Sequence, residues 1–196
     1  MTCAYALIFT AALSGFVQQG QRDAVEVHFV GEMRKVMREG DLSARIDLSR
    51  LSKMQHLYAL GPIEGLRGEV TIWDSKPSIA RIVDGKVITT QNFHSKACFL
   101  VYASVGDWQE APIPQVIADE KLLEKWLEQT ASARGVNTKR PFPFLIKDSP
   151  KKLSIHVVDK TDDSPHTPAK HEAIKRKFTL ENTSVKLLGF YSDSHH

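Results

Sequence analysis

One stretch constrains the fold of this chain more than any other, because turn-forming residues are concentrated in it. Residues 57–73 contain Gly61, Pro62, Gly65 and Gly68. Glycine adopts backbone conformations that other residues avoid, so the chain must turn tightly here before it extends. From Glu69 to Trp73 polar and apolar side chains alternate, which is typical of a strand with one buried face. The sequence therefore predicts turns that lead into a strand with Glu69 at its start.

Glu69 is the first candidate site residue. It follows a glycine, at a place where the backbone can approach a ligand closely. Its side chain shares a face with Thr71 and Trp73, opposite Val70 and Ile72. Two interpretations are open. Glu69 is either a surface glutamate beside a hairpin, the usual location for this residue type, or a carboxylate that meets a ligand at the mouth of a strand.

The remaining pattern predicts more strands than helices. Helices are predicted over residues 31–39, 47–51 and 119–134, the last with an apolar stripe that ends at Gly135. Turns are predicted at residues 75–78 and at Asp84-Gly85. Further strands are predicted over residues 25–30, 79–83, 86–89, 97–105, 142–147, 153–158, 177–180 and 185–191. The helices do not alternate regularly with the strands, so the expected fold class is α+β with mixed, mostly antiparallel sheets and a few helices.

Charge and cysteine content exclude several classes of protein. The chain has 26 Lys and Arg against 23 Asp and Glu, a net charge of +3, too small and dispersed for a nucleic-acid partner. The basic cluster at residues 170–177 is interpreted as a solvated strand edge. Cys3 and Cys98 are too few for a disulfide framework or a thiolate metal site. The apolar neighbours of Cys98 predict a buried side chain.

The N-terminal segment has the features of a signal peptide. Residues 4–17 are apolar apart from Thr10, Ser14 and Gly15, and this run is long enough for a signal but short for a membrane span. No Lys or Arg precedes it, so a buried first strand or an incomplete N-terminus are the alternatives. We expect a signal peptide over residues 1–20 and one domain over residues 21–196. A cleaved signal predicts a bacterial protein that is exported to the periplasm or secreted and is not attached to the membrane. Without a signal, the alternative is a cytoplasmic protein.

Local catalytic motifs do not assign a function. The sequence has no phosphate-binding glycine loop, no Cys-x-x-Cys, no His-Glu-x-x-His and no Gly-x-Ser-x-Gly. The order of its elements is more informative, together with Leu66-Arg67-Gly68-Glu69, Lys151-Lys152 and the segment from Phe178 to Phe190. This succession resembles the α-acetolactate decarboxylases over nearly the whole chain after the predicted signal.

The resemblance implies a carboxy-lyase that uses Zn²⁺ to convert 2-acetolactate, a small 2-hydroxy-2-methyl-3-oxo acid, into acetoin and carbon dioxide. In that family three histidines, two in a His-x-His pair, hold the zinc. The bound cation chelates the substrate and stabilises the enediolate left when carbon dioxide departs. A glutamate and an arginine flank the substrate. Glu69 falls on that glutamate and is expected to relay protons. The resemblance is also compatible with a homodimer.

Two departures from the family pattern accompany the resemblance. The arginine position falls on His156, which can donate a proton but lacks the fork that clamps a carboxylate. The family's zinc histidines follow the strand that matches residues 185–191. By spacing, these histidines would lie beyond His196, so the domain is expected to be incomplete at its C-terminus. A chain without the zinc histidines is expected to be inactive. The adjacent His195 and His196 would face opposite sides of a strand.

Two other functions remain open from the sequence. The first is a non-catalytic, exported α+β binding domain built on the same scaffold. The second is an unrelated metal hydrolase that uses His166, His171 and a carboxylate, with His166 in a predicted mobile loop over residues 161–170 and His171 directly after it.

Overall fold

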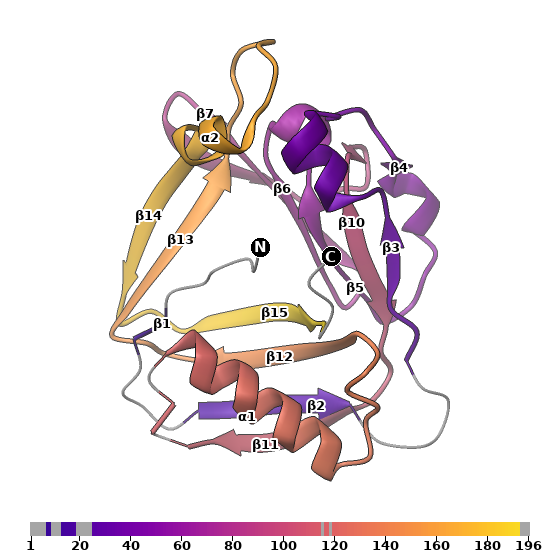
Figure 1. Cartoon of the computed structure of the whole chain (residues 1–196), viewed down its shortest axis with the longest axis vertical. Helices are drawn as coiled ribbons and strands as arrows, with labels where there is room; N and C mark the ends of the chain where they lie inside the picture. Colours follow the sequence, from indigo (N-terminus) through magenta and orange to yellow (C-terminus); the bar gives the residue numbers. More distant parts are fainter. Residues whose placement is uncertain (1–6, 9–12, 19–24, 115, 118, 193–196) are drawn as a thin grey trace. The chain divides into compact units, whose positions relative to one another are not determined.

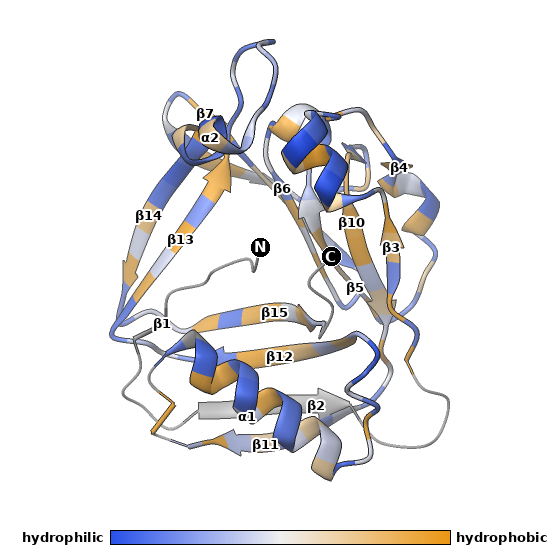
Figure 2. Cartoon of the chain, in the orientation of Figure 1, coloured by the Kyte–Doolittle hydropathy of each residue, from blue (hydrophilic) through white to orange (hydrophobic). Residues whose placement is uncertain are grey.

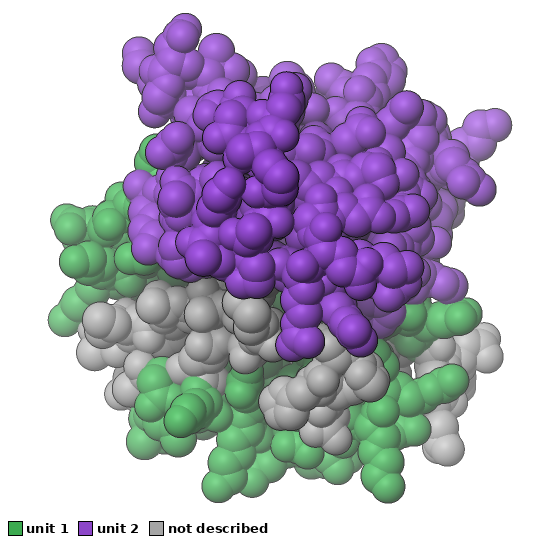
Figure 3. Space-filling model, turned by 45° about the horizontal axis from the view of Figure 1, so that its top comes forward, with its two compact units in different colours: residues 1–27, 105–155, 178–196 green, residues 28–104, 156–177 purple. Residues whose placement is uncertain are grey.

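The computed structural model describes residues 7–8, 13–18, 25–114, 116–117 and 119–192. The chain forms two compact units (Figure 3), each assembled from segments far apart in the sequence. Unit 1 draws on residues 1–27, 105–155 and 178–196, and unit 2 on residues 28–104 and 156–177. One domain is predicted over residues 21–196, and the described residues group into these two units. Antiparallel sheets with few helices dominate, which confirms the α+β class.

Unit 2 contains a six-stranded antiparallel sheet (Figure 1). In spatial order its strands are β3 (His28–Val30), β10 (Leu100–Ser104), β5 (Leu57–Pro62), β6 (Glu69–Trp73), β7 (Lys76–Val83) and β8 (Lys86–Thr90). Strands β6, β7 and β8 are joined by two-residue turns at Asp74-Ser75 and Asp84-Gly85, with positive φ at all four residues, as tight hairpins require. The second turn confirms the sequence prediction. The first lies earlier in the chain than the turn predicted over residues 75–78, because Lys76 and Pro77 are already in β7, with Pro77 opposite Ile72.

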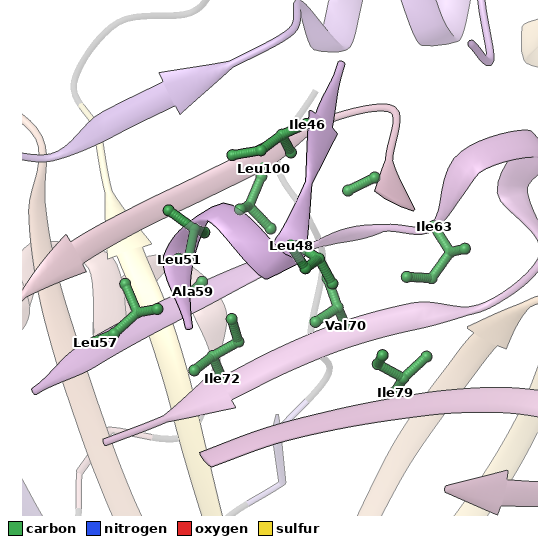
Figure 4. Packing of buried hydrophobic residues seen from close by; sticks show 11 residues of the cluster. Ile46, Leu48, Leu51, Leu57, Ala59, Ile63, Val70, Ile72, Ile79 and Leu100 are labelled. Atoms are coloured by element: carbon green, nitrogen blue, oxygen red, sulfur yellow. The ribbon is translucent and has the colours of Figure 1, made fainter. Parts of the chain in front are cut away.

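One face of this sheet carries the core of unit 2. Along β6 the buried and partly buried residues alternate, with Val70 and Ile72 in the core, as the sequence predicts. Leu48 and Leu51 cover this face from the 3-10 helix η2 (Leu48–Leu51) (Figure 4). Asp47 caps η2 by accepting a hydrogen bond from the Ser49 N–H, at the start of the helix predicted over residues 47–51.

Short elements surround this core. They are the π-helix η1 (Lys35–Glu39), β4 (Ile46–Asp47) paired with β9 (Lys96–Ala97), the 3-10 helices η3 (Glu64–Leu66) and η4 (Glu172–Ile174), and α2 (Pro168–His171). The predicted strand over residues 97–105 is interrupted at Cys98-Phe99, between β9 and β10. There the backbone passes so close to β5 that a Cβ at Gly61 would lie 2.1 Å from the Phe99 carbonyl oxygen. Only glycine fits at that crossing.

Unit 1 contains a four-stranded antiparallel sheet covered by a helix. The strand order is β11 (Trp108–Ile113), β2 (Leu13–Gln18), β12 (Phe142–Asp148) and β15 (Val185–Tyr191). Helix α1 (Glu120–Ala133) is amphipathic (Figure 2) and packs Leu123 and Leu127 against Ile113 and Ile146 of the sheet. Asp119 caps its start, and Gly135 follows its end with φ +80°. The structure thus confirms the strongest helix prediction.

Residues 13–18 of the predicted signal segment form β2, which pairs with β11 on one side and β12 on the other. The rest of residues 1–20, apart from the short strand β1 (Leu7–Ile8), lies outside the described residues. Cleavage after this segment stays a prediction. Cys3, His195 and His196 also lie outside the described residues.

Two long strands contribute residues to both units. β13 (Lys152–Val158) and β14 (Lys175–Glu181) are neighbours in a three-stranded sheet whose other strand is β1. The chain passes from unit 1 to unit 2 within β13 and returns within β14. Within the described residues, no helix has the length and apolar composition needed to cross a membrane.

Candidate functional site

Glu69 begins β6, at the point where the chain leaves the glycine-rich connection. Gly68, directly before it, has φ +128°, and a Cβ there would lie 2.3 Å from the Ala80 carbonyl oxygen. The position therefore requires glycine, and this close contact between β6 and β7 fixes where Glu69 enters the sheet. Across the sheet Glu69 pairs with Pro62 on β5 and Ala80 on β7. Glu69 therefore lies on an interior strand of the sheet.

The carboxyl group of Glu69 is largely withdrawn from water. Desolvation raises its pKa from 4.5 to about 7, although the Val158 backbone N–H donates to it and the Lys175 ammonium lies nearby, and both act in the opposite direction. A carboxyl group with this pKa exchanges protons near neutral pH. The structure thus excludes the solvated surface position that was one interpretation of Glu69.

His156, the second predicted site residue, lies in β13 and belongs to unit 2, like Glu69. Burial and the positive charges of Lys175 and Lys177 lower its pKa, partly offset by Glu172. A lowered pKa keeps the imidazole neutral at pH 7, with one nitrogen able to accept a proton. The described contacts include none between Glu69 and His156. What the two share is Lys175, whose charge acts on both.

Lys175 is the residue of this cluster that the sequence analysis missed. It was assigned to a solvated edge with the rest of residues 170–177, yet its side chain is only 19% exposed and pairs with Glu172. Hydrogen bonds from Lys175 and Lys177 lower the pKa of Glu172 to about 2. The signal available in the sequence was the alternation of Lys175 and Lys177 on one strand face, with Glu172 three residues before the first of them. That alternation does not reveal which residues lie opposite.

His166 and His171 form a second cluster. Their ring centroids are 5.4 Å apart, in an edge-to-face arrangement. His166 lies in a loop, as predicted, but its side chain is only 4% exposed, behind the turn at Gly40. Burial is the main cause that lowers the pKa of both rings. Within the described residues, both ring nitrogens of His166 and Nδ1 of His171 lack a hydrogen-bond partner.

These histidines do not form a recognisable metal site. The described residues contain no group of three or more His, Cys, Asp and Glu side chains that could hold a metal ion. The hydrolase hypothesis needs a carboxylate with His166 and His171, and no such set of three occurs in this part of the chain. The zinc expected from the family resemblance likewise finds no ligand set among the described residues.

Cys98 has a structural role. Its thiol is buried among Val36, Leu66 and Val158, and its Sγ lies 3.6 Å from the Ile63 carbonyl oxygen. Burial raises the pKa of the thiol to about 11, which keeps it protonated and a poor nucleophile. The prediction of a buried, small apolar side chain is confirmed.

Comparison with known proteins gives a fold. No family model matches the chain, and no curated protein matches it. The α-acetolactate decarboxylase of Bacillus subtilis strain 168 is similar in structure, with a TM-score of 0.65 and 16% sequence identity over 85% of this chain and 67% of that chain. A Staphylococcus aureus protein of unknown function, described as similar to α-acetolactate decarboxylase, gives a TM-score of 0.62 and 11% identity over the same shares. The chain therefore has an acetolactate-decarboxylase-like α+β fold.

Proposed function

We propose that this chain binds 2-acetolactate and that Glu69, with His156, handles protons in its decarboxylation to acetoin and carbon dioxide. The fold similarity supports the substrate class. The observation that carries the proposal is the Glu69 carboxyl group, with a pKa of about 7 beside the Lys175 ammonium. A group that titrates near the working pH is an effective general acid or base.

The chemistry of the reaction defines the task of these residues. When the bond between C1 and C2 breaks, carbon dioxide leaves and the electron pair is delocalised onto the oxygen at C3 as an enediolate. Acetoin forms when one proton is added to C2 and the C3 carbonyl group is restored. Protonated Glu69 is the proton donor in this proposal, neutral His156 accepts and returns protons, and Lys175 offers a positive charge to the substrate carboxylate.

Zinc is part of the proposal for the family activity, but the described residues do not fit it. They lack a group of three suitable ligands, so no step is assigned to a metal here. A second candidate function is the non-catalytic binding domain built on the same scaffold. In that case Glu69 and Lys175 would take part in binding only.

Proton linkage on binding tests the proposal. We use 2,3-dihydroxy-2-methylbutanoate, a stable analogue of 2-acetolactate in which the 3-oxo group is reduced. Its carboxylate, placed near Glu69, would raise the glutamate pKa further. We therefore expect uptake of a fraction of a proton on binding at pH 7, measured by calorimetry in two buffers of different ionisation enthalpy.

The matched variants are Glu69→Gln and Glu128→Gln, the second of which changes an exposed glutamate on α1. Proton uptake should disappear in Glu69→Gln and persist in Glu128→Gln. Binding with equal proton uptake in both variants would remove Glu69 from the site. Acetoin released from 2-acetolactate in a colorimetric assay separates the enzyme from the binding domain.

A further inference from the structure

Unit 2 also contains a pocket of about 990 Å³. Its described walls include Ile63, Gly65 and Arg67 between β5 and β6, Arg81 on β7, and Ser95 before β9. The loop from Lys160 to His166 and residues between Gly40 and Ser49 also line it. The volume suits a small organic ligand, for which pockets of roughly 300–1,000 Å³ are usual.

This pocket is separate from the Glu69 cluster. Ala80 is the cross-strand partner of Glu69, and directly paired residues project to the same face of a sheet. Arg81 follows Ala80, so its side chain projects to the opposite face, the face that buries Ile79. Neither Glu69 nor His156 lines the pocket. A ligand bound there would not contact the proposed proton-transfer residues.

Arg81 has unused hydrogen-bond donors. Its side chain is partly buried, and Nη2 donates to Ser95 Oγ at 3.0 Å. No carboxylate of the described residues lies within ion-pair distance of it. A guanidinium group carries five N–H donors in a planar fork that fits a carboxylate. Removing these donors from water costs free energy unless another hydrogen-bond partner replaces the water. The site therefore favours an anionic ligand.

The acidic side chains of the pocket already have partners. Asp162 binds Lys160 Nζ at 2.9 Å, Asp163 binds Arg67 Nη2 at 3.0 Å, and Asp47 caps η2. The carboxylate of Glu64 accepts a hydrogen bond from the Ala44 N–H at 3.2 Å. The lining holds four cations (Arg67, Arg81, Lys96 and Lys160) against these four acids. Arg67 and Lys160 are ion-paired with Asp163 and Asp162, so Arg81 is the arginine of this lining that can bind a ligand carboxylate, whereas a dianion such as phosphate would meet more repulsion from Asp47 and Glu64.

We propose that this pocket is a second small-molecule site that binds an organic monocarboxylate, with the ligand carboxylate bound by the Arg81 guanidinium beside the Ser95 hydroxyl. The inference does not depend on the proposed decarboxylation, because the two sites share no residue and lie on opposite faces of the β6–β7 pair.

A titration followed by two-dimensional ¹H–¹⁵N NMR tests this site in the whole chain. The probe is 2-hydroxyisobutyrate, and its uncharged amide, 2-hydroxyisobutyramide, is the matched control. We expect the carboxylate to shift the Arg81 side-chain Nε–H signal and the Ser95 and Lys96 backbone amides, and the amide to shift them little. Signals of Val158 and Lys175, which report on the Glu69 cluster, should give a separate titration curve or none.

Variants test whether the planar guanidinium group of Arg81 binds the ligand carboxylate. Arg81→Gln should weaken binding about tenfold or more, since hydrogen bonds to charged groups are the strong ones. Arg81→Lys keeps the charge without the fork and should fall between Arg81→Gln and the original chain. Arg67→Gln removes an ion-paired arginine from the same wall and should change binding less than Arg81→Gln does. Equal shifts with the amide, or shifts centred on Val158 and Lys175 in the unmodified chain, would overturn the proposal whether or not the variants fold.

Discussion

At the residue scale, Glu69 and His166 show how removal from water moves two kinds of titratable group in opposite directions. Burial disfavours the charged form of each, so the pKa of the Glu69 carboxyl rises and the pKa of the His166 imidazole falls. Because folding changes both pKa values, each residue links the stability of the chain to pH. The two effects have opposite signs and can be separated by substitution.

Glu69 should make the chain less stable as pH rises. Its pKa is about 7 in the folded chain against an ordinary value of 4.5, so the folded state binds more protons between these values and loses stability across that window. The difference corresponds to on the order of 3 kcal/mol. Denaturant unfolding from about pH 4 to pH 9 should show this loss in the original chain and not in Glu69→Gln. Parallel stability curves would mean that Glu69 is solvated.

His166 should make the chain less stable as pH falls. Its pKa is lowered from 6.5 by burial and by the charges of Lys160 and Lys170, so the unfolded chain binds the proton more readily below that value. Stability is therefore complete above about pH 6.5 and declines below it. His166→Phe keeps an aromatic ring and removes the titrating group. The free energy of unfolding of this variant should therefore decline less steeply below pH 6.5. A His166→Phe curve that matches the original would contradict this.

The sequence could indicate Glu69 but not the group around it. Alternation along residues 69–73 correctly predicts which way this side chain faces, because the period of a strand is local information. The cause of its pKa is not local. Val158 and Lys175 reach Glu69 only after the chain has left unit 2, crossed unit 1 and returned. No spacing within a short window encodes that meeting.

At the scale of elements, two glycines offer a matched test of the crossing between β5 and the Cys98-Phe99 break. A Cβ at Gly61 would lie 2.1 Å from the Phe99 carbonyl oxygen, whereas a Cβ at Gly106 would meet nothing within 4 Å. Gly61→Ala should lower the free energy of unfolding by about 2 kcal/mol or more, and Gly106→Ala by much less. Thermal and denaturant unfolding measure both. Equal losses would show that the close approach does not set the cost.

Strand β2 gives a test of the N-terminal segment. It lies between β11 and β12, so deletion of residues 1–20 would leave both strands without a shared neighbour and expose their edges. We expect a lower melting temperature and more aggregation than for the whole chain. A shortened chain of unchanged stability would instead support the signal-peptide interpretation, which intact-mass measurement of the exported protein addresses directly.

Elements defined by neighbouring residues were the predictable ones. The α1 stripe with its Asp119 cap and the Asp84-Gly85 turn depend on residues a few positions apart. Strand β11 is not among the predicted strands, and it contains Pro112, a residue type that usually argues against a strand. β11 is an edge strand in the described sheet, and an edge tolerates proline because one side of it needs no hydrogen-bond donor.

At the scale of the whole molecule, metal content is the property that separates the candidate functions. The described residues provide no set of three ligands, so we expect the purified 196-residue chain, reconstituted with zinc and dialysed, to retain well under one zinc per chain. Acetoin released above the spontaneous rate by such a chain would support proton handling by Glu69 and His156 without zinc, whereas no release would support the binding domain. Elemental analysis and the acetoin assay check the two statements. One tightly held zinc with acetoin formed would show that the ligands come from residues outside the described set.

The interleaving of the two units also determines when each can fold during synthesis. Unit 2 has all its residues once position 177 has been made, whereas unit 1 waits for the segment that begins at residue 178. Strand β2 must also wait, because its partners β11 and β12 begin only at Trp108 and Phe142. At about 5–20 residues per second, that leaves this apolar strand unpaired for several seconds or more on the ribosome. The unpaired strand of the nascent chain therefore offers an early binding site to chaperones and targeting factors. All residues of unit 2 are made before those of unit 1 are complete.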